Sequence, residues 1–492
     1  MSAPFTSLEG TLFILPDGPN TVPYHLGCHM LGDVSWPKGD NTQMFCPDPS
    51  GPNRYKQVGK VKGPPGLVTL SVETDILDVA DYLEDLTCPA GLIVTQMKSG
   101  GKGRVTNWRR AWVFPGFDVT TENLSNLVGK DTNDRSMRSV DANADEIISV
   151  LPLNAYRQST SQSTAINKIF SCDELVCQSE FDTAHAKCEK LYATSDATVG
   201  SALGTANVLY KSGTGSWTAM VSDPFATSEN VLAGVCVAVD NDTTRVIVFR
   251  GSTDAGNPAE VAYTDDDGAT AWTTANMGSV NGEFVGHANA AYALDYNHIW
   301  AGTDGGYIYF SDDGGTTWTA QESATIHAAQ WNWIQFVDEN TGFAGGAADV
   351  IAVTTDGGDT WSQVTVTGDG DDILCGWAFN SRQLWIGTDG GDIWFSDDQG
   401  TTWTKRTQAA FTGTGSVEAM AWANQWVGVV AWETGALTTY YFTKDGGYTW
   451  ETITTPTNGG VNSLFVCNTK LFFAAGEVVG STGLIHRLAP SS

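Results

Sequence analysis

Apolar and polar residues alternate over short stretches through most of the chain, and Gly, Asp and Asn separate one stretch from the next. Residues 318–361 show the pattern, with an aromatic stretch at 331–337, a Gly-rich stretch around Phe343 and a β-branched stretch at 351–355. Alternation over so few residues, bounded by turn residues, is typical of strands and not of helices. With one further strand directly after Trp318, the segment predicts four strands and a turn.

One turn sequence recurs along the chain. Residues 308–318 return almost unchanged as residues 393–403, and both contain the pattern Ser/Thr-x-Asp-x-Gly-x-Thr-Trp. Two degenerate copies come earlier: residues 264–272 have the Trp displaced by one position, and residues 212–217 have lost the Asp. The four intact copies are Ser311, Asp313, Gly315, Thr317 and Trp318; Thr354, Asp356, Gly358, Thr360 and Trp361; Ser396, Asp398, Gly400, Thr402 and Trp403; and Thr443, Asp445, Gly447, Thr449 and Trp450.

The copies follow a regular period. Their tryptophans are 42 to 55 residues apart, at Trp217, Trp272, Trp318, Trp361, Trp403 and Trp450. A period of this size indicates a propeller, a solenoid or an array. Residues 461–488 repeat the first three strands of a unit and then stop, which brings the number of units to seven. We expect residues 150–165 to supply the missing strand and close a seven-bladed ring.

The motif resembles the Asp-box (BNR) repeat of sialidases, sortilin-type receptors and photosystem assembly factors, which are β-propellers. The resemblance covers roughly residues 200–450 and implies that each box is the turn between the third and fourth strands of a blade. The residue types suit such a turn, because Asp accepts backbone hydrogen bonds, Gly takes a positive φ and Trp packs between blades. We therefore expect the four Asp residues to be structural, and neither catalytic nor metal-binding.

Residues 1–150 have a different pattern. A strand at 11–15 precedes a long Gly/Pro-rich stretch at 16–65, a strand at 66–72 and a helix at 74–86 with one apolar face. Residues 92–97 and 105–114 predict a hairpin. Five bases lie at its tip and return strand: Lys98, Lys102, Arg104, Arg109 and Arg110. We favour subunit contacts or solvated charge for them over contact with nucleic acid.

This order of segments, together with the run at residues 111–127, looks like the tail tube (major tail) proteins of long-tailed bacteriophages. That resemblance covers about 150 residues and implies a β-sandwich that stacks as hexameric rings through long loops. It further implies a location in the virion tail after assembly in the host cytoplasm, with other virion proteins as partners. A whole propeller is large for an appendage of such a subunit.

Charge is distributed unevenly along the 492 residues. The formal net charge is −30, of which about −5 lies in residues 1–150 and about −25 in the remainder. A strongly acidic propeller repels nucleic acid and anionic membranes, so we expect neither sequence-specific nucleic-acid binding nor membrane association. No apolar run approaches the length of a membrane span, and the N-terminus has no classical export signal. Nine cysteines without CxxC spacing imply neither a zinc site nor a full disulfide framework and favour the cytoplasm.

No candidate catalytic or metal-binding motif in the sequence is complete. A sialidase needs three arginines around a carboxylate, and the propeller's five arginines show no recognisable pattern: Arg245, Arg250, Arg382, Arg406 and Arg487. The histidines have no metal-binding spacing, and residues 368–372 lack the later Glu of a calcium loop. We therefore expect no catalytic residue, no metal and no cofactor.

The sequence predicts an all-β protein: a β-sandwich with one helix over residues 1–150, a polar linker over 151–170 and a seven-bladed propeller over 171–492. The favoured function is a non-enzymatic tail tube subunit that assembles with itself and displays the propeller on the virion. One alternative is a module that binds a glycan or protein of the host surface. The other is a sialidase-like glycoside hydrolase.

Overall fold

The structure is a computed structural model. Up to residue 150 it describes strand backbone at 10–16, 24–25, 41–47, 55–62, 68–73, 90–97, 108–125, 137–143 and 148–150. Beyond that it describes residues 151–158, 160, 163–171, 190–196, 208–212, 215–222, 224–225, 230–240, 243–251, 260–277, 290–323, 326, 329–366, 370–407, 411, 414–435, 437–453, 455 and 459–490. The chain divides into two compact units, with the main boundary between Pro152 and Leu153.

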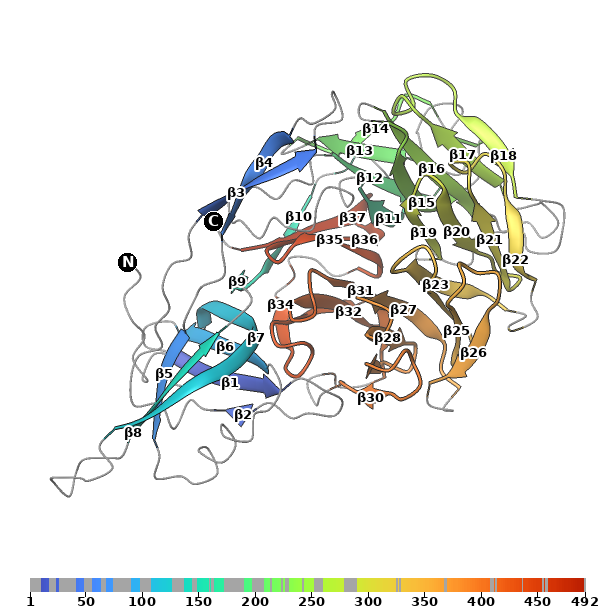
Figure 1. Cartoon of the computed structure of the whole chain (residues 1–492). Coiled ribbons are helices and arrows are strands. Elements are labelled where there is room, and N and C mark those ends of the chain that lie inside the picture. The colour runs from blue at the N-terminus through green and yellow to red at the C-terminus, as the bar shows by residue number, and fades with distance from the viewer. Residues whose placement is uncertain are drawn as a thin grey trace. The chain divides into compact units, whose positions relative to one another are not determined.

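The second unit contains seven antiparallel sheets of four strands each, which makes it a seven-bladed β-propeller (Figure 1). Blade 1 comprises β11 (Ile166–Phe170), β12 (Lys190–Ser195), β13 (Val208–Ser212) and β14 (Thr218–Ala219). Blade 2 comprises β15 (Asn230–Ala238), β16 (Thr244–Gly251), β17 (Glu260–Thr264) and β18 (Thr273–Asn276). Blade 3 comprises β19 (Ala291–Asp295), β20 (His298–Gly302), β21 (Tyr307–Ser311) and β22 (Thr319–Ser323). Blade 4 comprises β23 (Trp331–Phe336), β24 (Gly342–Gly346), β25 (Val350–Thr354) and β26 (Ser362–Thr365). Blade 5 comprises β27 (Ile373–Ala378), β28 (Leu384–Thr388), β29 (Ile393–Ser396) and β30 (Thr404–Lys405). Blade 6 comprises β31 (Ser416–Trp422), β32 (Gly428–Thr434), β33 (Leu437–Thr443) and β34 (Glu451–Ile453), and the last three strands are β35 (Val461–Asn468), β36 (Leu471–Val479) and β37 (Thr482–Ala489).

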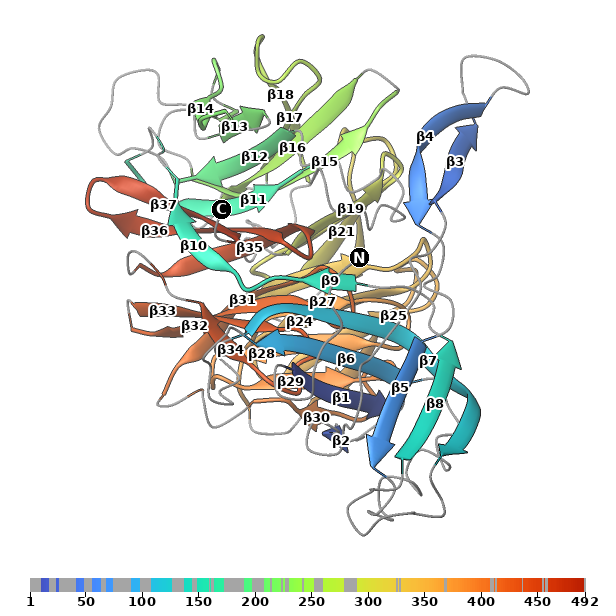
Figure 2. The same cartoon turned by 90° about the vertical axis from the view of Figure 1, so that its left-hand side faces the viewer.

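The ring closes through a strand from before the first blade. β10 (Asn154–Arg157) pairs antiparallel with β37, with Asn154 opposite Ala489, and so becomes the fourth strand of blade 7 (Figure 2). This confirms the expected seven blades and the expected source of the closing strand. The stretch 151–170 was expected to be a linker, but it contains both β10 and β11, so the propeller begins before residue 171.

The innermost strands share a departure from regular pairing. In six of the seven blades, one residue near the N-terminal end of the innermost strand has no pairing partner in the second strand, and the register shifts there. We call it the skipped residue. In three blades the skipped residue is an asparagine whose Nδ2 donates to a carbonyl at the start of the next innermost strand: Asn167 to Val231 (3.1 Å), Asn332 to Ile373 (2.8 Å) and Asn462 to Ile166 (3.2 Å). These bulges direct polar side chains toward the adjacent blade and link the blades.

Aromatic rings fill the space between blades. The ring of Trp300 in blade 3 stacks on that of Phe336 in blade 4, with centroids 3.5 Å apart and an interplanar angle of 7°. Trp385 of blade 5 and Trp422 of blade 6 stack in the same way at 4.3 Å. All four side chains are buried, so these contacts hold neighbouring blades together through apolar area as well as ring geometry.

The first unit holds a sheet in the order β2-β1-β6-β7-β8-β5, with β9 also paired to β7, and a separate hairpin of β3 and β4. Its strands are β1 (Gly10–Pro16), β2 (Tyr24–His25), β3 (Asn41–Pro47), β4 (Tyr55–Lys62), β5 (Val68–Glu73), β6 (Ala90–Met97), β7 (Trp108–Ser125), β8 (Met137–Asn143) and β9 (Ile148–Val150). The pairing of β6 with β7 matches the predicted hairpin. Residues 16–65, expected to be irregular, contain three of these strands. The predicted helix at 74–86 lies outside the described residues, and the β-sandwich stays a prediction.

Candidate functional site

The repeat turns, defined here as the segments that carry the recurring motif, have one hydrogen-bond network. In the first intact copy, Asp313 Oδ1 accepts the backbone N–H of Thr317 at 2.8 Å, and Asp313 Oδ2 accepts the Thr317 hydroxyl at 2.7 Å. Ser311 Oγ donates to Asp313 Oδ1 and accepts the N–H of Gly315, each at 2.9 Å. Gly315 has φ +81°, a conformation that favours glycine. Each motif residue thus has a local bonding role.

The same bonds recur in the other turns. Asp356, Asp398 and Asp445 each accept the N–H and the hydroxyl of the Thr four positions later. The degenerate copy keeps them too, because the two oxygens of Asp266 bond the Thr264 hydroxyl at 2.7 Å and the Thr270 hydroxyl at 2.7 Å. Displacement of the Trp therefore leaves the turn intact.

These bonds favour the ionised form of three turn carboxylates, Asp313, Asp356 and Asp398, whose pKa values they lower. Hydrogen bonds from Thr360 and Thr354 lower the pKa of Asp356. Burial acts to raise the pKa of Asp313, but the bonds from Thr317, Ser311 and Thr316 outweigh it, so that this pKa also lies below its usual value. A carboxylate that is ionised and already occupied by its own turn is a structural group and has little capacity left for chemistry.

The motif tryptophans differ in what they contact. The Trp318 ring meets Phe249 of the preceding blade edge-on, with centroids 5.7 Å apart, and Trp450 Nε1 donates to the Arg406 carbonyl next to blade 5 at 3.1 Å. The Trp318 ring thus packs between two blades, and Trp450 is hydrogen-bonded to the segment next to the preceding blade. Trp361 instead packs edge-on against Phe336 of its own blade, with centroids 5.8 Å apart.

The basic residues proposed for assembly are only partly described. Lys98, Lys102 and Arg104 lie outside the described residues. Arg109 and Arg110 lie in β7, and Arg110 is exposed, with its guanidinium 5.8 Å from the centre of the Trp112 ring. Their role in subunit contacts remains a prediction.

Three of the propeller arginines are engaged with groups of the propeller itself, and Arg245 also donates to the Gly314 carbonyl of the next blade at 3.2 Å. Arg245 forms a two-pronged pair with Asp265 at 2.7 and 2.8 Å and lies 4.2 Å from the centre of the Tyr263 ring. Arg250 pairs with Glu260 at 2.9 Å, and Arg382 donates to the Asp397 carbonyl at 3.0 Å. Guanidinium groups committed in this way do not converge on a common acceptor among the described residues.

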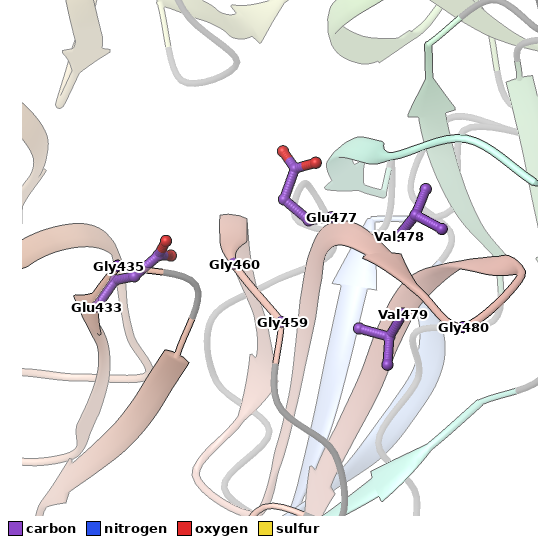
Figure 3. Close-up of a pocket in the computed structure, with 8 residues that line it drawn as sticks. All are labelled: Glu433, Gly435, Gly459, Gly460, Glu477, Val478, Val479 and Gly480. Atoms are coloured by element: carbon purple, nitrogen blue, oxygen red, sulfur yellow. The ribbon is translucent and has the colours of Figure 1, made fainter.

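A pocket with a volume of ≈ 400 Å³ lies between blades 6 and 7 (Figure 3). Its lining consists of Glu433, Gly435, Gly459, Gly460, Glu477, Val478, Val479 and Gly480. The carboxylates of Glu433 and Glu477 lie on either side of Gly460 in Figure 3, and a Cβ on Gly460 would come within 3.2 Å of both Glu433 oxygens. The glycines therefore make the space between two carboxylates.

The electrostatics of this pocket extend into its neighbours. Burial raises the pKa of Glu433, and the nearby charges of Glu418 and Glu477 raise it further, against the bond from the Val461 N–H to Glu433 Oε2 at 3.2 Å. Burial likewise raises the pKa of Glu418, with a contribution from Asp389. The group is a line of mutually repelling carboxylates from three blades, which suits a cationic ligand.

Sequence reasoning missed these glutamates because none belongs to the repeat motif. Glu433 and Glu477 lie at the ends of β32 and β36, and only the ring geometry brings them together. The pair of glycines at 459–460 and the acidic residues, which lie far apart in the sequence, form no motif that could be recognised from the sequence.

The structure also describes some of the cysteines. Cys236 and Cys467 each take part in a disulfide bond, whereas Cys375 is a buried free thiol. The cytoplasmic location stays a prediction. Among the described residues, none forms a helix with the length and apolar character needed to cross a membrane.

Comparison with known proteins concerns the propeller. A family model described as Sortilin, neurotensin receptor 3 matches residues 349–465, and no curated protein matches the chain. Similar solved structures include YCF48 bound to D1 peptide (14% identity, TM-score 0.49, covering 69% of this chain and 96% of that one) and YCF48 from Cyanidioschyzon merolae (15%, 0.49, 68% and 98%). The GH74 xyloglucanase from Xanthomonas campestris gives 14% identity and a TM-score of 0.49, covering 66% of this chain and 53% of that one. The strand pairing itself shows that the chain from Asn154 to Ala489 is a seven-bladed β-propeller.

Proposed function

We propose that the chain is a non-enzymatic structural protein of a bacteriophage virion. In this proposal the first unit is a tail-tube-like domain that assembles with itself, as hexameric rings or a helical array, and the propeller is displayed outward. The observation that carries the proposal is the closure of the propeller by β10, because a ring of blades that is complete within one chain needs no strand from a second copy. In this proposal, assembly is the task of the other unit.

Features of the first unit support this division of roles. Its main sheet ends at strands β2 and β5, and the β3–β4 hairpin forms a sheet of its own. Sheet edges and a separate hairpin are the elements through which one copy can extend the sheet of the next. The resemblance of the segment order to tail tube proteins points the same way.

We also propose that the repeat turns are Asp boxes. They lie between the third and fourth strands of their blades, as the family motif implies. The backbone N–H groups that bond their Asp carboxylates belong to the same turn. This assigns the motif residues to blade stability and leaves the surface elsewhere for function.

A second candidate function is the binding of a host-surface protein, and the acidic pocket is the observation that favours it. The lining holds two glutamates and no lysine or arginine, so the ligand would present a basic side chain. We do not propose hydrolysis, because three of the five arginines that a sialidase site could draw on, Arg245, Arg250 and Arg382, are engaged with groups of the propeller itself.

Negative-stain electron microscopy of the purified full-length chain tests the proposal. We expect rings or tubes of uniform diameter with extra density on the outside. A field of single particles that bind host cells would instead favour the second candidate function, and turnover of a sialoside would overturn both.

A further inference from the structure

Three potential metal ligands from two blades meet at one edge of the propeller. Asp295 ends β19 and His298 begins β20 in blade 3, while Glu339 lies in the turn between β23 and β24 of blade 4. One ligand atom from each lies within 4.8 Å of those of the other two. Among the described residues no other such group of His, Cys, Asp and Glu occurs.

The two ligands of blade 3 are held in place before any ion binds. Asp295 Oδ1 accepts the backbone N–H of Asn297 and lies 2.8 Å from His298 Nδ1. The imidazole ring packs against Trp300, with centroids 6.1 Å apart and an interplanar angle of 25°, and lies 6.2 Å from the ring of Phe310. A ring fixed by aromatic neighbours loses little freedom on coordination.

Glu339 is positioned by its own turn. Asp338 Oδ1 accepts the N–H groups of Asn340 and Thr341 at 2.8 and 2.7 Å, and the Asn340 carbonyl accepts the Gly357 N–H at 2.8 Å. These bonds fix the backbone on both sides of Glu339, while its side chain is exposed and free to turn toward blade 3.

We propose that Asp295, His298 and Glu339 form a site for a divalent transition-metal ion of the zinc type. One imidazole nitrogen and two carboxylate oxygens suit Zn²⁺, whereas Ca²⁺ takes six or more oxygens. Bonds of about 2.1 Å would bring the ligand atoms to roughly 3.4 Å of one another, which a rotation of Glu339 achieves. The ion takes the place of the hydrogen bond between His298 Nδ1 and Asp295: the neutral imidazole binds through Nδ1 in the tautomer that carries its proton on Nε2, and a water completes a tetrahedral site.

The alternative to a metal site is a purely structural role, in which Asp295 and His298 stabilise their own turn and the carboxylate of Glu339 lies nearby by chance. The two explanations differ at Glu339, because the pair needs only blade 3 and the metal site needs both blades. An ion bound as proposed links blade 3 to blade 4 and raises the thermal stability of the propeller.

The test is isothermal titration of full-length, chelator-treated protein, with its disulfide bonds intact, with Zn²⁺, repeated with the variants H298Q and E339Q. We expect the wild type to bind one equivalent more than H298Q, and E339Q to lose at least about tenfold in affinity for that equivalent. Asp312 is exposed in the same blade, so D312N is the matched control for loss of one charge and should bind as the wild type does.

Other cysteines, histidines and acids add background binding that is common to all four proteins, so only differences between them count. A second readout is the visible absorption of Co²⁺ in the wild type, which each of H298Q and E339Q should abolish. Equal stoichiometry and affinity in the wild type and H298Q would overturn the proposal, and so would an E339Q variant that binds normally.

Discussion

The aspartates of the repeat turns act at the scale of single residues. Each carboxylate serves donors within four positions of itself, so the sequence motif alone is sufficient to predict the bonding. The local character of the network also explains why a degenerate copy, at Asp266, keeps the same contacts.

Replacing Asp313 by Ala should lower the free energy of unfolding by roughly 1–3 kcal/mol, because the Thr316 and Thr317 N–H groups lose their acceptor. Chemical denaturation of the full chain measures the effect. The neighbouring exposed Asp312, changed to Ala, controls for loss of charge and should be close to neutral. Equal stability of D313A and D312A would contradict the structural role.

Glu418 presents the opposite case, a carboxylate that is poorly accommodated. It is the skipped residue of β31, the position that asparagine occupies in blades 1, 4 and 7. Burial and Asp389 raise its pKa above the ordinary 4.5, so the folded state takes up a proton more readily than the unfolded state. The ionised form therefore destabilises the fold above the raised pKa, and this penalty disappears as the pH falls toward 4.5.

We expect E418Q to raise the free energy of unfolding at about pH 7 by roughly 1 kcal/mol and the gain to vanish as the pH approaches 4.5. The amide keeps an oxygen that accepts the Ser416 hydroxyl. Thermal melts across this pH range, with E451Q on the outer strand β34 as control, check the prediction. A gain that is independent of pH would mean that the charge of Glu418 is not the cause.

At the scale of elements, strand number and blade number were predictable because both follow from local alternation and a fixed period. The closing strand was predictable because the last unit has only three strands. The bulges of the innermost strands were not, since a skipped residue such as Asn332 reveals itself only through its bond to the next blade. The acidic pocket and the Asp295, His298 and Glu339 cluster depend in the same way on neighbours far apart in sequence.

Removal of β10 tests the closure directly. Residues 163–492 produced alone should unfold at a lower denaturant concentration than residues 153–492. In the shorter protein β37 lacks the strand that pairs with its edge, and the hydrogen bond from the Gln158 N–H to the Ile485 carbonyl is lost. We expect a loss of several kcal/mol, since a whole strand of pairing and packing disappears. Equal midpoints for the two proteins would show that β10 contributes nothing to closure.

At the scale of the whole molecule, charge and topology suggest different tasks for the two units. The propeller part of the chain has a net charge near −25, so two propellers repel each other at short range, although salt screens them beyond about 8 Å. Residues 1–150 are nearly balanced and hold both basic and acidic groups. Complementary contacts between copies are therefore available mainly in the first unit.

Size-exclusion chromatography with light scattering, applied to the full chain and to residues 153–492, tests this division of roles most directly. The account predicts that the full chain runs as a ring or larger assembly and that the propeller alone is a monomer at every concentration. A propeller that oligomerises by itself, or a full chain that stays monomeric, would contradict it.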